Sequence, residues 1–467
     1  MSMMRVRWLA ATVVVALGVA ACGNNRSTTS SSTAGGGGNT TTTAPAGPTF
    51  GDAALPCGPA KPGSPPNTAS DTGVTADTIT IGAGDDRGYA QAPGLNKEMT
   101  EAVQAIVAVC NKAGGINGRQ IKVNTYDAAI LAIQKAMTQA CSDNLFFLVG
   151  EGFALDSNQE ETRLGCKLPA VPGYSVSAAF ANAPLMYEPV PNPADQYTSE
   201  PAVELARLEP DAITASATLV GNFSATQETR DKVTAAYPTF GFKFLANGKI
   251  EYSIFGEPDW TPFIKRLKDA GAKFVYWSGE CTNLLKAMEA AKLNNYKAVW
   301  QTETNHYEAK CAASNTDGAM DGLYIRMAFI PFEEASTDKA VQDYLKMISD
   351  AGTKPTQLGM QSSSSFLLWA TAAQSCGAQL TRQCVLDYLK KVHKWTGHGL
   401  HAPADPGGNN APNCAVLLQL EGQKYVRVSP KETGTYDCDA NSVVTVDTTA
   451  VQKAKLDANR VAQEFNK

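Results

Sequence analysis

Acidic, hydroxyl and aromatic side chains follow several of the strands that apolar alternation predicts. In a parallel sheet these positions matter, because ligands bind beyond the carboxyl ends of the strands. The candidate ligand-binding residues are Asp86, Tyr89, Glu151, Gly152, Phe153, Ala154, Tyr174, Ser175, Asn222, Phe223, Glu280, Glu303 and Asn305. The alternative for each of them is a packing or capping role.

Motifs for catalysis and nucleotide binding are absent from the sequence. It contains no G-x-S-x-G elbow, P-loop or H-E-x-x-H pattern. Gly82-x-Gly84-x-x-x-Gly88 departs from the dinucleotide spacing, and Asp85-Asp86 would repel a pyrophosphate. An amidase or esterase would need a nucleophile with a base in reach. We therefore expect no enzyme and no cofactor.

A second cluster, His393, His398, His401 and Asp405, could hold a metal ion. However, two of its histidines lie three residues apart in a loop rich in Gly and Pro, without a helix to fix their geometry. We expect a structural loop and no metal site.

The elements that position the candidate ligand residues begin at residue 79. Ile79 and Ile81 predict a strand, and apolar residues from Met99 to Cys110 recur at helical spacing. Gly114 suits the end of that helix, and Asn117-Gly118 a turn into a second strand. Strand, helix and strand form a βαβ unit, and the same alternation continues along the chain.

The run Ala113-Gly-Gly-Ile-Asn-Gly-Arg119, followed by a strand that ends in Tyr126-Asp127, resembles the type I periplasmic solute-binding proteins of ABC importers, the leucine/isoleucine/valine-binding family. The resemblance extends over roughly residues 76–428. It implies an α/β fold of two three-layer α/β/α lobes with parallel sheets, joined by three hinge crossings.

The resemblance also implies a division of the chain. We expect lobe 1 at 71–195 plus 329–412 and lobe 2 at 196–328 plus 413–467. Prolines between 184 and 201 predict an irregular crossover. Val451, Leu456, Val461 and Phe465 predict a weakly amphipathic helix in the tail.

In amino-acid-binding relatives, hydroxyls after the third and fourth strands hold the carboxylate, and a glutamate of the second lobe holds the ammonium. Ser175 and Glu303 fall on two of these positions, whereas the loop at Glu151–Leu155 lacks the serines. The match to a standard branched-chain amino acid is therefore partial. Phe153, Tyr174 and Phe223 instead suit an apolar or aromatic ligand.

Residues 1–22 predict a lipoprotein signal peptide. Arg5 and Arg7 precede an apolar run, and Val19-Ala20-Ala21-Cys22 resembles a lipobox, in which Cys22 would be acylated. The alternative is an ordinary secretory signal cut nearby. Residues 23–70, rich in Ser, Thr and Gly at first, predict a flexible tether and lead-in. We expect an exported lipoprotein on the extracytoplasmic face of the membrane.

Eleven cysteines include Cys22, so an even number remains for disulfides in an exported chain. The sequence alone does not choose among the pairings. Placement on the predicted elements favours Cys376–Cys384, Cys414–Cys438, Cys281–Cys311 and Cys141–Cys166, which leaves Cys57 for Cys110.

The charge balance excludes a nucleic-acid footprint. Lys+Arg 40 against Asp+Glu 45 is mildly acidic, and there is no long basic run. We expect a solute-binding protein that captures a small ligand, an amino acid or a related molecule, for the permease subunits of an ABC importer. A sensor ectodomain of the same fold is the alternative.

Overall fold

The computed structural model describes residues 47–466, so the predicted signal peptide, Cys22 and the first part of the predicted tether lie outside the described residues. Within that part every helix is too short or too polar to cross a membrane. The helices are α1 (Lys97–Lys112), α2 (Ile133–Ser142), α3 (Glu160–Gly165), α4 (Ala178–Ala181), α5 (Glu200–Leu208), α6 (Ser224–Ala236), α7 (Thr261–Asp269), α8 (Cys281–Leu293), α9 (Ala309–Ser314), α10 (Lys339–Asp350), α11 (Gln357–Ser375), α12 (Arg382–Leu389) and α13 (Thr449–Ala454).

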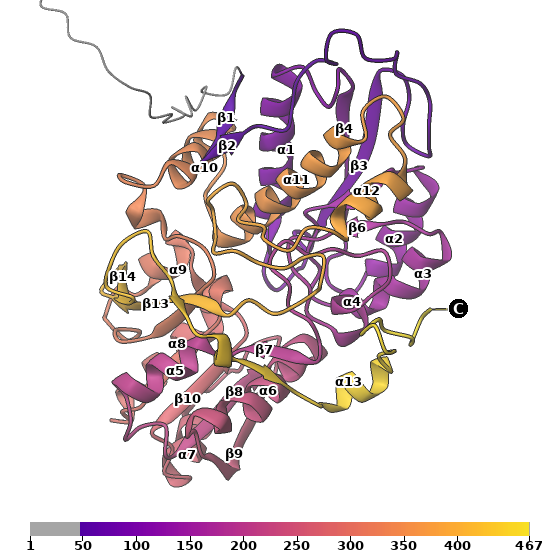
Figure 1. Cartoon of the computed structure of the whole chain (residues 1–467). Helices are drawn as coiled ribbons and strands as arrows, with labels where there is room; N and C mark the ends of the chain where they lie inside the picture. The colour runs from indigo at the N-terminus through magenta and orange to yellow at the C-terminus, as the bar shows by residue number, and fades with distance from the viewer. Residues whose placement is uncertain (1–46, 467) are drawn as a thin grey trace, which may run out of the picture. The chain divides into compact units, whose positions relative to one another are not determined.

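The first sheet is parallel throughout. Its strand order is β4 (Gln120–Asp127), β3 (Thr78–Asp85), β5 (Phe147–Val149) and β6 (Ala170–Val171). Helices α1 and α11 pack on one face, although they lie far apart in the sequence (Figure 1). Helix α2 covers the other face.

The second sheet has a parallel part and an antiparallel edge. β9 (Phe244–Tyr252), β8 (Ser216–Gly221), β10 (Phe274–Ser278), β11 (Val299–Thr302) and β12 (Tyr324–Met327) are parallel, and β13 (Cys414–Glu421) and β14 (Lys424–Ser429) follow antiparallel. Helices α7 and α8 pack on one face, and α5 and α6 on the other. The predicted α/β class with parallel sheets is confirmed.

The chain passes between the sheets three times, over residues 172–215, 328–338 and 390–413. The first passage carries β7 (Gln196–Thr198), which pairs with β16 (Val443–Thr445). Helix α5 begins within the predicted irregular stretch, with Pro201 in its first turn, where a missing N–H costs nothing. Two short pairings complete the fold, β1 (Thr49–Phe50) with β2 (Ala53–Ala54), and β15 (Asp437–Cys438) with β13.

The first βαβ unit has the predicted turn chemistry. Gly114 lies at φ 113° after α1, and Asn117 and Gly118 take φ 49° and 87° in the turn before β4. Glycine adopts these angles without the steric cost of a Cβ, and asparagine tolerates them. The turn sets α1 against β3 and β4.

A serine run on α11 holds the loops that follow β5 and β6. The helix is buried around most of its surface, and the hydroxyls of Ser362 and Ser365 donate to the carbonyls of Gly150 and Pro172, each at 2.7 Å. Small side chains allow this close approach, and the hydrogen bonds satisfy buried carbonyls. The candidate ligand loops after β5 and β6 are thereby fixed to one helix.

All five predicted disulfides are present, with Cα atoms 4.1 to 6.1 Å apart. Cys57–Cys110 ties the lead-in segment to α1, and Cys414–Cys438 joins β13 to β15. The connectivity therefore agrees with the placement of the cysteines on the predicted elements.

The prediction of one amphipathic helix in the tail is wrong. Helix α13 stops at Ala454, because Lys455 takes a left-handed φ of 51° and Asp457 then caps a turn by accepting the N–H groups of Asn459 and Val461. The tail packs on α4 instead (Figure 1). Tertiary contacts outweigh a weak apolar periodicity over so short a segment.

Candidate functional site: a cavity between two sheets

A cavity of about 260 Å³ lies where the carboxyl ends of strands from both sheets face each other. The first sheet contributes the loop after β6, with Tyr174 and Ser175, and the second contributes the loops after β8, β10 and β11. Strand β7 adds Tyr197, and β12 adds Arg326. Residues from both sheets and from the crossover that carries β7 thus line the same cavity.

Seven of the predicted site residues line the cavity. They are Ala154, Tyr174, Ser175, Phe223, Glu280, Glu303 and Asn305. The other six, Asp86, Tyr89, Glu151, Gly152, Phe153 and Asn222, are not among its lining residues. Their roles in binding remain predictions, but the structure shows what several of them contact.

Two of the residues outside the lining organise neighbouring loops. The carboxylate of Asp86 accepts the backbone N–H groups of Ile130 at 2.6 Å and Ala154 at 2.8 Å, while burial raises its pKa to about 6. Asn222 accepts the N–H of Ile254 at 3.0 Å. These contacts bring Ala154 and Ile254 to the cavity.

Phe153 and Glu151 are buried in the first half of the molecule and do not line the cavity. Phe153 is 1% exposed and packs in the core beside α2. Glu151 is fully buried, and neither carboxylate oxygen has a hydrogen-bond partner among residues 47–466. Burial raises the pKa of Glu151 to about 8, so the carboxyl is neutral at pH 7.

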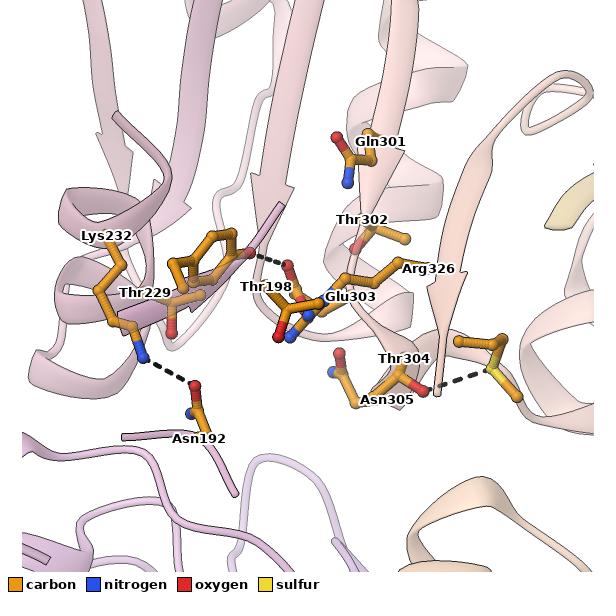
Figure 2. A network of polar contacts seen from close by, with 12 residues as sticks. Asn192, Thr198, Thr229, Lys232, Gln301, Thr302, Glu303, Thr304, Asn305 and Arg326 are labelled. Atoms are coloured by element: carbon orange, nitrogen blue, oxygen red, sulfur yellow. Dashed lines mark hydrogen bonds and ion pairs between the residues drawn. The ribbon is translucent and has the colours of Figure 1, made fainter. Parts of the chain in front are cut away.

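Glu303 and Arg326 form an ion pair at the end of β11 and β12 (Figure 2). The hydroxyls of Tyr276 and Tyr197 also donate to Oε1 of Glu303, at 2.6 and 3.0 Å. Burial would raise the pKa of Glu303, but Arg326 and these hydroxyls hold it below its usual value. Glu303 is therefore a carboxylate with its charge already matched.

Ser175 is engaged in the same way in the other half of the cavity. Its Oγ donates to Oε2 of Glu188 at 2.6 Å, and its backbone N–H donates to Oε1 at 3.0 Å. The N–H of Asn192 donates to the same carboxyl at 3.0 Å. Glu188 thus occupies the donors that the resemblance assigned to a ligand carboxylate.

Two cations flank the ring of Tyr197. The Arg326 guanidinium carbon lies 5.3 Å from the ring centroid, and Nζ of Lys232 lies 5.5 Å from it. Lys232 donates to Oδ1 of Asn192 at 2.7 Å (Figure 2). It also donates to the carbonyl of Pro193 at 2.9 Å. Burial and the nearby Arg326 lower the pKa of Lys232 to about 7.

Most of the remaining lining is apolar. Both halves contribute to it, through Leu95, Ile130, Val176, Val190, Phe223, Ile254, Met327, Ala328 and Leu358. A lining whose surface is mostly apolar, with charged and polar side chains set into it, is typical of sites for small organic molecules.

The histidine cluster of the sequence does not converge on one point. His393 pairs with Asp405 at 2.7 Å, whereas His401 contacts the hydroxyl of Ser364 at 2.8 Å and the carbonyl of Ala402. Among residues 47–466 no group of three His, Cys, Asp or Glu side chains has metal-site geometry.

Sequence reasoning missed Arg326, Lys232, Glu188 and Tyr197. Arg326 had a usable signal, because it is the one charged residue in the otherwise apolar stretch from Leu323 to Pro331. Lys232 reads as the solvent side of a helix, and Tyr197 lies in the proline-rich crossover. Their convergence requires the fold.

A family model described as periplasmic binding protein matches residues 78–424, which is well over half of the chain. The chain belongs to the periplasmic binding protein family. That family consists of solute-binding proteins rather than enzymes, and it implies an extracytoplasmic location. A comparison with curated proteins found no match.

This periplasmic binding protein is also similar in fold to solved structures of low sequence identity. A fatty acid ABC transporter substrate-binding protein from Thermomonospora curvata is 14% identical, with a TM-score of 0.65 over 82% of this chain and 97% of that one. A leucine-binding protein from Thermotoga maritima is 10% identical, with a TM-score of 0.62 over 75% and 97%. An R. palustris solute-binding protein in complex with 4-hydroxybenzoate is 14% identical, with a TM-score of 0.62 over 75% and 96%.

Proposed function

We propose that this protein is the solute-binding component of an ABC importer, anchored to the membrane through an acylated Cys22. It captures a small organic ligand in the cavity between the two sheets and presents it to permease subunits. The observation that carries the proposal is the cavity itself, which receives lining residues from both halves of the periplasmic binding protein fold.

The size and chemistry of the cavity limit the ligand. An apolar cavity of roughly 150 Å³ holds a benzene molecule. About 260 Å³ therefore suits a single ring or a short branched chain with polar substituents. The similar proteins whose descriptions mention leucine, a fatty acid and 4-hydroxybenzoate support an organic ligand with an apolar part.

Capture works by closure of the two halves on the ligand. A ligand that contacts both halves favours the closed state by its differential affinity. Direct contacts beside the cavity support this. Oε2 of Glu228 on α6 accepts the N–H of Ala178 on α4 at 2.9 Å, and Lys232 on α6 bonds to Asn192 and Pro193 of the crossover.

Thermal unfolding against a ligand panel tests the proposal. The mature protein is unfolded in the presence of amino acids, primary amides, short peptides, aromatic acids, fatty acids and sugars. A ligand of the native state raises the melting temperature as its concentration exceeds Kd. At least one class of small organic compound should give a saturable shift. Shifts by none of them would contradict a solute-binding role.

A further inference from the structure

Ser175 and Glu303, which would hold the carboxylate and the ammonium of an amino acid, are both present in the cavity. Each of them is already hydrogen-bonded to another residue of the protein. The donors of Ser175 are taken by the carboxyl of Glu188, at 2.6 and 3.0 Å. The carboxylate of Glu303 is taken by Arg326, Tyr276 and Tyr197. A zwitterionic α-amino acid would have to break both sets of bonds in order to bind as the resemblance implies.

The guanidinium of Arg326 is the charged donor of the lining that remains open. Its Nε–H donates to Glu303, and its other four N–H donors have no hydrogen-bond acceptor among residues 47–466. The amide of Gln357 and Oε1 of Gln361 are uncharged lining groups that also lack a hydrogen-bond partner among residues 47–466. The side chain of Arg326 is 23% exposed, and it is part of the cavity lining. Buried polar groups are normally paired, so the open edge of this guanidinium suits an acceptor that comes with the ligand.

The position of the guanidinium is fixed on two sides. Glu303 holds Nε, and the ring of Tyr197 lies 5.3 Å from the guanidinium carbon. A planar guanidinium whose fork is held in place matches the two oxygens of a carboxylate with little loss of conformational entropy. Nζ of Lys232, which lies 5.5 Å from the centroid of the same ring, is a second basic group at this end of the cavity.

We propose that the ligand is an organic acid whose carboxylate binds the free edge of Arg326, with its apolar body against the cavity wall and without an ammonium group. The inference rests on the proposed function and names the ligand class for the same cavity. Glu303 then acts as a positioning residue for Arg326, and the ligand's charged end lies in the second half of the molecule.

Glu280 is another carboxylate of the lining that a ligand ammonium could contact. Glu280 lines the cavity, and its side chain has no hydrogen-bond partner among the described residues. Burial raises its pKa, whereas the positive charge of Lys310 lowers it and offsets part of the charge of Glu280. Matched acids with and without an amino group test this point directly.

The experiment is calorimetric titration of the mature protein with matched probes. These are benzoate, 4-hydroxybenzoate and hexanoate as acids, benzamide and hexanamide as neutral isosteres, and phenylalanine and leucine as amino acids. The wild-type protein should bind at least one acid at least about 10-fold more tightly than its amide, which is the effect of one charge-assisted hydrogen bond. The corresponding amino acids should bind no better than the amides.

The variants are Arg326→Gln and Arg326→Lys. Gln at this position should remove the preference for acid over amide, and Lys should keep part of it. Arg207→Gln is the matched control, because Arg207 also pairs with a glutamate but is 61% exposed on α5, outside the lining. The comparison of acid with amide on the wild-type protein stands even where a variant fails to fold.

Three results overturn the inference while leaving the proposed function intact. These are equal binding of acids and amides, tighter binding of amino acids than of either, and an acid preference that survives in folded Arg326→Gln. Binding of no probe at all, together with no thermal shift from any other compound, would instead contradict the proposed function.

Discussion

The hydroxyl of Ser175 donates to Oε2 of Glu188 across 2.6 Å, with both residues buried. The serine after the fourth strand therefore already donates its hydrogen bond to a carboxyl of the protein itself. The same happens to Glu303, whose partner is Arg326. These pairs convert an amino-acid clamp into two internal contacts and leave the guanidinium of Arg326 as an open, positively charged donor in the cavity.

The direction in which Glu303→Gln changes ligand affinity shows whether Glu303 positions Arg326 or contacts the ligand directly. Glu303→Gln keeps an oxygen that accepts the Arg326 Nε–H but removes a negative charge next to the guanidinium. The attraction for a bound acid should rise by on the order of 1 kcal/mol, so acids should bind severalfold more tightly. Calorimetric titration of wild type and variant measures it. Weaker binding in the variant would favour a direct contact of Glu303 with a ligand ammonium.

Glu151 predicts how stability depends on pH. An ordinary glutamate in the unfolded chain loses its proton near pH 4.5, whereas burial keeps Glu151 protonated up to about pH 8 in the folded protein. Between these values unfolding releases a proton, so stability falls as pH rises, by up to about 1.4 kcal/mol per pH unit. Glu151→Gln stays neutral and should reduce this slope.

Denaturant unfolding from pH 5 to pH 8 measures the slope. Asp156 and Glu188, whose pKa values burial raises to about 8 and about 7, contribute in the same direction, so part of the slope remains in the variant. Glu432→Gln, at an exposed position, is the control and should leave the slope unchanged. An unaltered slope in Glu151→Gln would mean that Glu151 ionises in the folded state.

The disulfides should differ in their contribution according to the loop that each closes. Cys57 and Cys110 are 53 residues apart, and Cys376 and Cys384 only 8. The chain-entropy model gives stabilisation of about 4 kcal/mol for the longer loop and about 2.5 kcal/mol for the shorter. The double Ser variants, compared by urea unfolding, should rank in that order. The reverse order would show that native contacts of the short loop outweigh loop entropy.

Membrane attachment depends on a residue outside the described part of the chain. If Cys22 is acylated, the wild-type protein should fractionate with membranes and Cys22→Ser should fractionate as soluble protein. Cys57→Ser is the control, since it removes a cysteine that pairs with Cys110 and should not release the protein. Equal membrane association of wild type and Cys22→Ser would contradict the lipid anchor.

Local signals in the sequence were sufficient for the first βαβ unit, whereas the two-lobe arrangement followed from the family resemblance. The βαβ unit from Ile79 to Asp127 follows from two periodicities and from turn residues whose φ values only Gly or Asn tolerate well. Four of the disulfides could be assigned because their cysteines lie near the ends of predicted elements, and the pairing of Cys57 with Cys110 followed by elimination. The tail failed because α13 is short, and Asp457 stops any continuation of its periodicity.

The binding cavity could be predicted only in part. Loops after strands are readable from sequence, so Tyr174, Phe223 and Glu303 were found. Whether a polar residue faces the cavity or is consumed by a neighbour depends on contacts over long separations, such as Ser175 with Glu188 or Tyr197 with Glu303. The charge of Arg326 was visible, but its pairing with Glu303 required the register of β11 and β12.

The most direct test of the account is a crystal structure of the protein with the best-binding acid of the panel. The account predicts the ligand inside the cavity, with a carboxylate oxygen at about 2.8 Å from a terminal guanidinium nitrogen of Arg326. It also predicts that the Ser175–Glu188 and Glu303–Arg326 contacts persist. A carboxylate on Ser175 with Glu188 displaced, or a ligand bound outside the cavity, would contradict it.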